Sequence, residues 1–215
     1  NGLPLVHIEL KRRGVALREA FNQINRYQDE SFRGDDGLFE YVQIFVISNG
    51  TDTKYYSNST RKLHLADQQK KSKKKHLSHA SESFKFASSW ADKRNNKIRD
   101  LEDFARSFFN KPTILNILTK YCVFTSDKSL LVLRPYQIAA VEAMLIKIVQ
   151  SSFYGYKDRR ISGGCIFHST GTGKTLTSFV ASKLIGEMSW GDDEDDEIEK
   201  VLLVVDRKDL DYQTV

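Results

Sequence analysis

The most informative stretch of the sequence is a glycine-rich loop, HSTGTGKT, that runs from His168 to Thr175. Gly171 and Gly173 allow backbone N–H groups to turn inward around phosphate oxygens, and a following helix adds its positive N-terminal end. Lys174 can then reach the β- and γ-phosphates of a nucleotide, while the hydroxyl of Thr175 is placed to ligate Mg²⁺. Such a pattern arises by chance in about one chain in a hundred of this length. The loop therefore predicts a nucleotide and Mg²⁺ site rather than a turn beside a surface lysine.

A second set of chemically capable residues lies near the start of the chain, where Glu9 and Lys11 flank Leu10. On a strand, residues two apart project from the same face, so Glu9 and Lys11 stand together while Leu10 points into a core on the opposite face. A carboxylate is a hard ligand for Mg²⁺, and a neighbouring ammonium can orient an attacking water or offset charge on a phosphate. Gln23 and Tyr27 share one face of the helix predicted next. The alternative is an exposed ion pair at a strand end.

The elements predicted for residues 1–56 would position this pair. A short strand ends at Leu10, and apolar residues then recur at helical spacing from Val15 onward. After a polar, glycine-rich loop, residues 41–50 are predicted as a buried strand, which turns into a second strand at Thr53–Tyr56.

The middle of the chain changes in composition. Residues 59–83 hold few large apolar side chains and include a basic run at 61–75, so they are interpreted as a linker, an inserted loop or a disordered stretch. Two helices are predicted after this tract, because apolar residues again recur at helical spacing. Their stripes are Leu101, Phe104, Ala105 and Phe108, then Ile114, Ile117, Leu118 and Tyr121.

The last third alternates strand and helix patterns. A helix is predicted from Pro135, a short strand over 164–167 leads into the glycine-rich loop, and a helix follows it. Val201–Val205 is then a continuous apolar strand of the kind found inside parallel sheets. This order predicts the opening of an α/β domain that is truncated at its C-terminal end, because a single β-loop-α-β unit cannot close a parallel sheet.

Composition narrows the class of protein. With 40% hydrophobic and 28% charged residues, the chain is neither disordered throughout, collagen-like nor a disulfide scaffold, and no apolar run approaches the ~20 residues of a membrane span. The net charge of +5 permits a polyanionic partner without requiring one. Cys122 and Cys165 lie in apolar contexts and are interpreted as buried free thiols in a reducing compartment. No secretion signal precedes Leu10, and the missing initiator Met hints at a fragment.

The predicted strand that ends at Leu10 and the helix predicted from Val15 resemble the PD-(D/E)xK nuclease core. The resemblance is in particular to the core of bacterial nucleases with a Gln-x-x-x-Tyr extension. The resemblance implies that Glu9, Lys11, Gln23 and Tyr27 are catalytic and that Glu9 binds Mg²⁺. That family also places an Asp on the strand before Glu9. This sequence has none there, so either it starts after that Asp or the site is defective.

The glycine-rich loop resembles the first helicase motif of superfamily-two translocases, although His168 stands where Gly or Ala is usual. Residues 201–210 resemble the next motif, and residues 133–137 (LRPYQ) resemble an adenine-reading Gln motif. Gln137 would then hydrogen-bond the base with Arg134 near it; the alternative is a core helix with a surface glutamine. The implied ATP-binding residues are Arg134, Gln137, Thr170, Gly171, Thr172, Gly173, Lys174 and Thr175, of which Thr175 also binds Mg²⁺.

Over nearly its whole length the sequence is similar to the restriction (motor) subunit of type I restriction-modification enzymes. The matching phrases include VHIELKRRGVALREAFNQINRY, FKFASSWAD, HSTGTGKT and VVDRKDLDYQT. The resemblance implies a cytoplasmic bacterial or archaeal protein of α/β class. It would comprise the C-terminal part of a PD-(D/E)xK nuclease core over residues 1–56, a connector with a basic insertion and helices over 57–125, and the start of a RecA-like superfamily-two helicase lobe over 126–215.

This resemblance also implies an activity: ATP-dependent DNA translocation with Mg²⁺-dependent cleavage away from the recognition site. The implied partners are double-stranded DNA and the modification and specificity subunits. The 215-residue segment alone is expected to be inactive, because it lacks an acidic Mg²⁺ box, a second lobe and the first nuclease acid. One alternative is a superfamily-two helicase or remodelling ATPase without nuclease activity. Another is a basic scaffold or interaction segment that holds nucleic acid electrostatically through Arg61, Lys62, Lys70, Lys71 and Lys73–Lys75.

Overall fold

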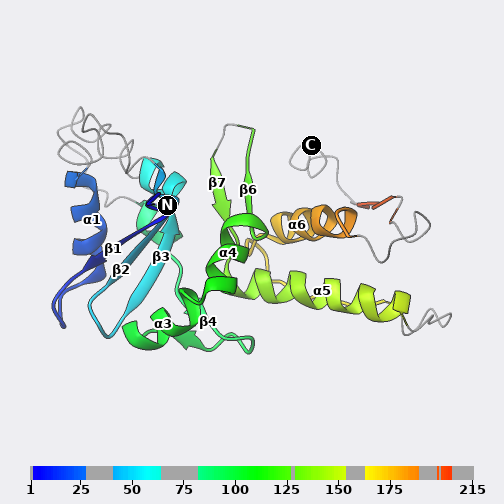
Figure 1. Ribbon diagram of the computed structural model, residues 1–215, viewed down its shortest axis with the longest axis horizontal. Coiled ribbons are helices and arrows are strands. Elements are labelled where there is room, and N and C mark those ends of the chain that lie inside the picture. Colours follow the sequence, from blue (N-terminus) through cyan, green and yellow to red (C-terminus); the bar gives the residue numbers. More distant parts are fainter. Residues whose placement is uncertain are drawn as a thin grey trace. The chain divides into compact units, whose positions relative to one another are not determined.

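The computed structural model divides the chain into two compact units, residues 1–132 and 133–215 (Figure 1). Each unit is described by itself. The residues that the structure describes are 2–27, 41–63, 82–126, 129–153, 163–188, 198 and 200–204. Most of the basic run at 61–75 and the whole of the acidic segment at 191–197 lie outside them.

The first unit is built on a three-stranded sheet in the order β1-β2-β3 (Figure 1). Strand β1 (Val6–Leu10) pairs in parallel with β2 (Ile44–Ser48), which pairs antiparallel with β3 (Thr53–Ser57). All five residues of β2 are buried, as its β-branched and aromatic content predicts. The strands expected on both sides of the Asn49–Gly50 turn are therefore confirmed.

Helix α1 (Leu17–Tyr27) lies over one face of this sheet and closes the main hydrophobic core. Its apolar residues recur at the spacing of one helical face, and Phe21 and Ile24 are almost fully buried. Across from them lie sheet residues of the same core, Phe45, Ile47 and Tyr56. The ring of Phe21 meets that of Tyr56 edge-on at 4.8 Å between centroids. The helix predicted from Val15 is thus confirmed.

The second face of the sheet is covered only in part. Tyr55 of β3 packs against Trp90 and Phe108, and this cluster protects β2 and β3. Among the described strands, β1 lies at one edge of the sheet, and Leu10 remains 56% exposed. The prediction that Leu10 points into a core on the face opposite Glu9 is therefore wrong for the described residues, because the aromatic cluster reaches β2 and β3 but leaves the edge strand uncovered.

Small elements complete the first unit. After β3, the described chain forms a 3-10 helix (Glu82–Phe86). It then forms two short strands, β4 (Trp90–Ala91) and β5 (Lys97–Ile98). The two predicted helices follow as α3 (Leu101–Phe108), capped by Asp100, and α4 (Lys111–Thr119), with Pro in its first turn. Strands β6 (Cys122–Phe124) and β7 (Leu130–Val132) form an antiparallel hairpin.

The second unit packs α5 (Pro135–Phe153) against α6 (Lys174–Gly186). Residues 163–168 run between the two helices without a strand partner among the described residues. Residues 201–204 likewise have no strand partner among the described residues. Phe167 and Val204 are 95% and 91% exposed. The prediction of a strand at 164–167 and a buried strand at 201–205 is therefore wrong for the described residues, because a parallel strand needs a neighbour for its backbone hydrogen bonds.

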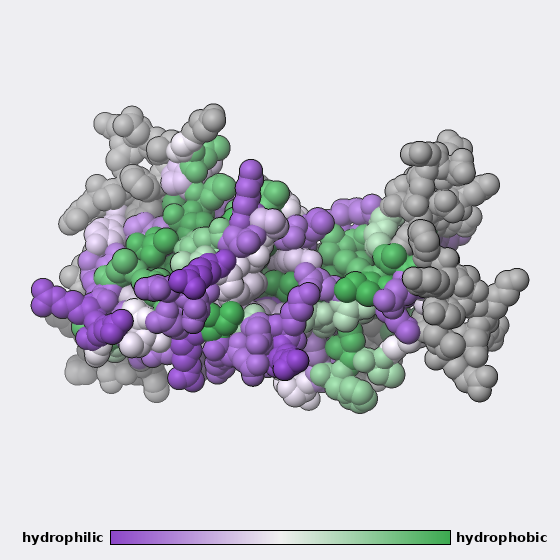
Figure 2. All heavy atoms as spheres, turned by 60° about the horizontal axis from the view of Figure 1, so that its bottom comes forward, coloured by the Kyte–Doolittle hydropathy of each residue, from purple (hydrophilic) through white to green (hydrophobic). Residues whose placement is uncertain are grey.

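Uncovered apolar side chains are common in this unit. Figure 2 shows hydrophobic residues gathered on its visible face, and Ile146 of α5 and Phe179 of α6 are 54% and 40% exposed. None of the helices described is long and apolar enough to cross a membrane. The strands and helices of the first unit, together with the two helices described in the second, give a mixed α/β protein, as the sequence predicts.

Candidate functional sites

The carboxylate and ammonium predicted on the first strand meet at the end of β1. Lys11 Nζ lies 3.0 Å from Glu9 Oε1, and the side chains are 19% and 11% exposed. The backbone ladder continues past the strand, because Lys11 N donates to Ser48 O at 2.8 Å. Lys11 is thus held at its backbone by β2 and at its side chain by Glu9. The alternative of a fully exposed ion pair does not fit this burial.

Helix α1 adds the other two predicted residues to the same place. Lys11 Nζ donates a hydrogen bond to Gln23 Oε1, and Gln23 Nε2 donates to Tyr27 Oη at 2.6 Å. The helix buries Phe21 in the core, which turns Gln23 and Tyr27 toward the end of β1. The four residues form one hydrogen-bonded series, Glu9–Lys11–Gln23–Tyr27, called here the relay. The structure therefore brings together all four residues that the sequence predicts as catalytic.

Two residues that the sequence does not group with Glu9 and Lys11, His7 and Arg61, lie beside the relay. His7 stands two residues before Glu9 on the same face of β1, with its ring 6.0 Å from that of Tyr27. Burial lowers the pKa of His7 below its ordinary value, and Arg61 lowers it further, while Glu9 acts in the opposite direction. The guanidinium of Arg61 lies 5.3 Å above the ring of Phe45. His7 could have been identified from sequence, because side chains two residues apart on a strand share one face.

Arg61 was assigned only to the basic-scaffold alternative and not to this site, because it opens the polar tract interpreted as a linker, an inserted loop or a disordered stretch. Residues 58–63 are instead helical, and Ser59, Thr60 and Arg61 are buried. Ser59 Oγ accepts a hydrogen bond from Leu130 N, which ties this helix to β7. The linker interpretation is therefore wrong for the start of the tract, where short polar side chains are satisfied by hydrogen bonds inside the first unit.

The metal-binding capacity of the relay is limited to one carboxylate. Glu9 offers a hard oxygen of the type that Mg²⁺ prefers. Among the described residues there is no group of three or more His, Cys, Asp and Glu side chains that could hold a metal ion. Glu9 could therefore serve as one metal ligand. The Glu9 carboxylate would then interact with both the ion and the neighbouring Lys11 ammonium.

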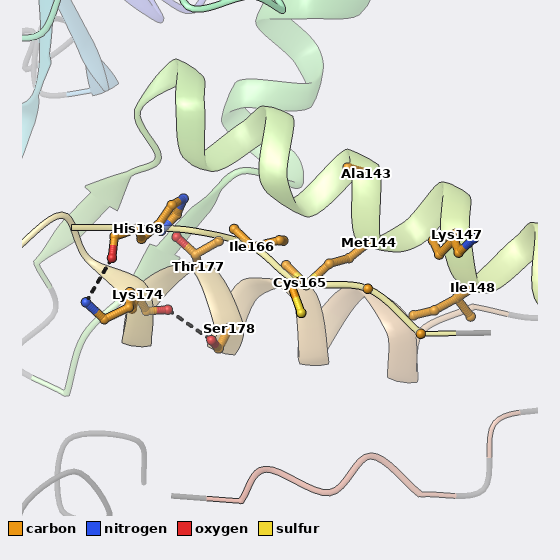
Figure 3. Close-up of a pocket in the computed structure, with 12 residues that line it drawn as sticks. Ala143, Met144, Lys147, Ile148, Cys165, Ile166, His168, Lys174, Thr177 and Ser178 are labelled. Carbon is orange, nitrogen blue, oxygen red and sulfur yellow. Dashed lines mark hydrogen bonds between the residues drawn. The ribbon is translucent and has the colours of Figure 1, made fainter. Parts of the chain in front are cut away.

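The glycine-rich loop has the backbone of a phosphate cradle. Gly171 and Gly173 adopt φ of 77° and 81°, values that glycine takes without strain. Gly173 is the N-cap of α6 and makes no side-chain cap hydrogen bond, so the first N–H groups of α6 are not covered by a capping side chain. Lys174 Nζ donates to His168 O and Ser169 O at 3.3 and 3.2 Å, and Figure 3 shows this side chain turned back toward His168. The ammonium thus rests on loop carbonyls.

The remaining residues expected at the nucleotide lie on both sides of this loop. Thr170 is exposed at its tip, Thr172 Oγ1 donates to Ser169 O at 2.6 Å, and Thr175 is half-buried in the first turn of α6. Gln137, in the first turn of α5, is only 3% exposed and donates to the carbonyls of Thr172 and Gly173. The backbone of Arg134 donates to Gln137 Oε1 at 2.8 Å.

A cavity of about 480 Å³ adjoins the loop, between α5, α6 and residues 163–168 (Figure 3). Its walls include Met144 and Ile148 of α5, Cys165 of the extended segment and Lys174. The cavity lies next to the cradle, and Lys174 belongs to both. Cys165 is exposed and Cys122 half-buried, so the prediction of two buried thiols is wrong, because the segment that carries Cys165 is not covered as a strand would be.

Comparison with known proteins gives the same order of regions along the chain. The family described as "Type I restriction enzyme R protein N terminus" matches residues 1–64, and the family described as "SWI2/SNF2 ATPase" matches residues 136–215. The relay therefore lies in the first matched region and the phosphate loop in the second.

Individual relatives match most or all of the chain. An endonuclease subunit of a type I restriction enzyme from Staphylococcus aureus is 40% identical over 215 residues, which are all of this chain and 19% of that relative. A type I restriction enzyme endonuclease subunit from Escherichia coli is 53% identical over 153 residues, or 71% of this chain and 43% of the relative. A putative one from Methanocaldococcus jannaschii is 26% identical over 220 residues, which are 99% of this chain and 20% of the relative. The chain thus spans about a fifth of the length of the first relatives that it matches. The resemblance drawn from its motifs is confirmed: the first matching family and these relatives both support a restriction subunit of a type I restriction enzyme.

Proposed function

We propose that this chain is part of an ATP-dependent DNA translocase that is also a Mg²⁺-dependent endonuclease and cleaves DNA away from its recognition site. The observation that carries the proposal is that a single chain holds both the assembled relay and a phosphate loop. Residues 1–56 would supply part of a PD-(D/E)xK nuclease core and residues 126–215 the start of a RecA-like lobe. Residues 57–125 would connect them.

The relay supports the nuclease half of this proposal. A Mg²⁺ ion on Glu9 would polarise the scissile phosphate and lower the pKa of a bound water. Lys11 lies 3.0 Å from the carboxylate, close enough to orient an attacking water or to offset charge that develops on the phosphate. Gln23 fixes the direction of the Lys11 ammonium, and Tyr27 fixes the amide of Gln23. Each residue thus holds the next in a single geometry, which is what catalytic preorganisation requires.

The phosphate loop supports the motor half. Lys174 rests on the carbonyls of His168 and Ser169, and the phosphates of ATP would replace these carbonyls as its partners. The glycine backbone and the first N–H groups of α6 would surround the same phosphates. Thr175 would offer its hydroxyl to the Mg²⁺ that accompanies ATP. Arg134 and Gln137 would lie at the side of the loop where the start of α5 meets it.

The partners in this proposal are double-stranded DNA and the modification and specificity subunits of a type I complex in the cytoplasm. The match of residues 1–64 to the R protein N terminus favours this function over a superfamily-two ATPase without nuclease activity. The basic-scaffold alternative is tested by replacing five lysines with glutamine: Lys70, Lys71, Lys73, Lys74 and Lys75. An unchanged slope of log DNA affinity against log salt would exclude these lysines as phosphate contacts.

The test of the proposed function separates its two halves. In the intact protein, Lys174→Ala should abolish ATP hydrolysis, because the loop loses its only charged phosphate ligand. Lys11→Ala and Glu9→Ala should stop DNA cleavage while ATP hydrolysis continues. Arg106→Ala, a change at an exposed position of α3, is the matched control and should alter neither reaction. Normal ATP turnover by Lys174→Ala would refute the motor half, and cleavage at the parental rate by Glu9→Ala would refute the nuclease half.

A further inference from the structure

Three consecutive cations, Lys11, Arg12 and Arg13, follow the last residue of β1. Lys11 belongs to the relay, whereas both arginines are exposed. Residues 12–15 form a tight turn, called here the arginine turn, because Val15 N donates to Arg12 O at 3.2 Å. Gly14 takes the third position of this turn with a φ of 85°. Arg13 therefore stands at the corner of the turn, two residues after Lys11.

A second turn, at the end of β2, holds the arginine turn on both sides. Before it, Lys11 N donates to Ser48 O at 2.8 Å. At its end, Asn49 Nδ2 donates to Val15 O at 2.8 Å, a hydrogen bond between residues 34 positions apart. Asn49 is only 7% exposed. The segment that carries the two arginines is therefore fixed to the end of β2.

The amide of Asn49 uses its two ends for two different purposes. Its Oδ1 accepts from Thr51 N at 3.2 Å, from Thr51 Oγ1 at 2.9 Å and from Asp52 N at 2.8 Å, which shapes the turn after β2. Its Nδ2 donates across to Val15 O. A side chain with oxygen atoms alone could accept in the turn but could not donate to a carbonyl in this way unless it carried a well-placed hydroxyl. Asparagine thus joins the two turns.

Arg13 is the arginine that packs on this second turn. A Cβ added at Gly50 would lie 3.5 Å from both Cγ and Nε of Arg13, so the stem of the arginine runs beside the bare backbone of Gly50. Gly50 has a φ of 88°, which glycine adopts without strain. Its carbonyl accepts from Leu101 N at 3.2 Å, which anchors the turn to the start of α3. The stem of Arg13 is therefore supported while the residue stays exposed.

An exposed arginine with a supported stem is suited to bind a phosphate. Its guanidinium is always charged and presents N–H donors in a fixed fork that matches phosphate oxygens. Two residues of chain span at most about 7 Å, so Arg13 begins within that distance of Lys11. The phosphates of one DNA strand advance about 3.4 Å each along the duplex axis. With a scissile phosphate at Glu9 and Lys11, Arg13 is thus within reach of a neighbouring phosphate.

We propose that Arg13 binds a DNA phosphate next to the scissile one, and that Asn49 is a positioning residue that holds the arginine turn in place for this contact. The inference rests on the proposed nuclease function and names a further contact of the same site with duplex DNA. Because phosphates carry no sequence information, the contact should form on DNA of any sequence.

The test measures binding of the intact protein, without ATP, to a short linear duplex over a range of salt concentrations. Arg13→Gln removes one phosphate contact, so the slope of log affinity against log salt should become less steep by about 0.9. Counterion release from that one contact corresponds to a loss of affinity of about eightfold at 0.1 M salt. Arg13→Lys keeps a cation and should retain the parental slope. Arg106→Gln, at an exposed position of α3, is the matched control and should also retain it.

The role of Asn49 is tested by a double-mutant cycle. Asn49→Ser keeps an oxygen that can accept in the turn but is too short to reach Val15 O, so its slope should also become less steep, by roughly 0.5–0.9. In the double variant with Arg13→Gln the two losses should not add, because Asn49 acts through Arg13. Thr51→Ala removes a hydrogen bond inside the turn, leaves the one to Val15 and should bind DNA as the parent does.

Three results would overturn the proposal. A parental slope for Arg13→Gln would show that Arg13 contacts no phosphate. If that variant bound DNA as the parent does but assembled poorly with the modification subunits, Arg13 would face protein instead. Additive losses in the double variant would show that Asn49 does not act through Arg13. Should Asn49→Ser not fold, as judged by circular dichroism, Asn49→Asp replaces it in the cycle, because its carboxylate accepts in the turn but cannot donate to Val15 O.

Glu9→Ala distinguishes failure of this inference from failure of the nuclease proposal. This variant should not cleave DNA, and cleavage at the parental rate would mean that the nuclease site itself is misassigned. If Glu9→Ala is inactive while Arg13→Gln keeps the parental slope, only the inference fails.

Discussion

Replacement of Gln23 by methionine tests the relay most directly, because methionine keeps the length and volume of the side chain but neither donates nor accepts strongly. The variant removes the hydrogen bond from the Lys11 ammonium to Gln23 Oε1 and the one from Gln23 Nε2 to Tyr27. A hydrogen bond that involves a charged group contributes about 1.5–3 kcal/mol, and a neutral one about 0.5–1.5 kcal/mol. If the Lys11 contact is needed in the transition state, cleavage should slow by roughly 10- to 100-fold.

The assay is the rate of linearisation of a supercoiled plasmid that carries the recognition site, with ATP and Mg²⁺ and the intact complex in excess. Tyr27→Phe removes only the neutral hydrogen bond, so we expect a loss of about 2- to 10-fold. Asn22→Met, a change at the exposed neighbour on the same helix, is the matched control and should cleave at the parental rate. Parental cleavage by Gln23→Met would refute the relay. If Tyr27→Phe lowered the cleavage rate more than Gln23→Met, the order of the residues in the relay would be refuted. ATP hydrolysis should be unchanged throughout.

Three further predictions concern stability. Phe21→Ala empties a fully buried site between α1 and the sheet and should lower the free energy of unfolding by about 3–5 kcal/mol, measured by urea denaturation; a loss below about 1 kcal/mol would contradict the packing described. Asp100→Ala removes the carboxylate that accepts from Glu102 N and Asp103 N, so these two amides should exchange hydrogen faster at the start of α3, while amides of β2 keep their rates. Hydrogen bonds from Asn96 lower the pKa of Asp92 below its ordinary value of 3.8. Ionised Asp92 therefore stabilises the β4–β5 turn above pH 3.8, and this stabilisation is lost as the pH falls through the lower pKa of the folded state. NMR shifts of the Asp92 carboxyl group should give that pKa. A titration midpoint above 3.8 would mean that ionised Asp92 destabilises the turn.

The first unit could be predicted well because its signals are local. The spacing of Leu17, Phe21 and Ile24 fixes which face of α1 is buried, and that face then determines where Gln23 and Tyr27 point. The period of a strand brings Glu9 and Lys11 to one side for the same reason. These four residues could be grouped from sequence because each lies on an element whose orientation depends on its own pattern.

The predictions that failed depend on contacts distant in sequence. Alternation along β1 cannot tell which face a helix will cover, so Leu10 was predicted buried and is exposed. Composition alone assigned Arg61 to a linker, although its helix packs beside β7 and its guanidinium lies over Phe45. The apolar run that begins at Val201 has strand character, but strand character does not supply the neighbour that a strand needs.

Local patterns were also insufficient at the phosphate loop. The sequence predicts the cradle from Gly171, Gly173 and Lys174, since each role follows from residue type. It cannot show that Gln137 turns toward the loop, because that depends on how closely the first turn of α5 approaches Gly173. A pattern can name the residues of a site, whereas the partner of each polar atom requires coordinates.

The parallel pairing of β1 with β2 affects when the relay can form during synthesis. A parallel ladder needs a crossover, so the chain must leave β1, pass through α1 and return before Glu9 can face Ile47. At about 5–20 residues per second, that return takes roughly 2–8 s of translation. Until then, Lys11 lacks the Ser48 carbonyl that holds its backbone. Glu9 and Lys11 are therefore made before the strand that fixes them, so the relay cannot take its final geometry until β2 has been synthesised.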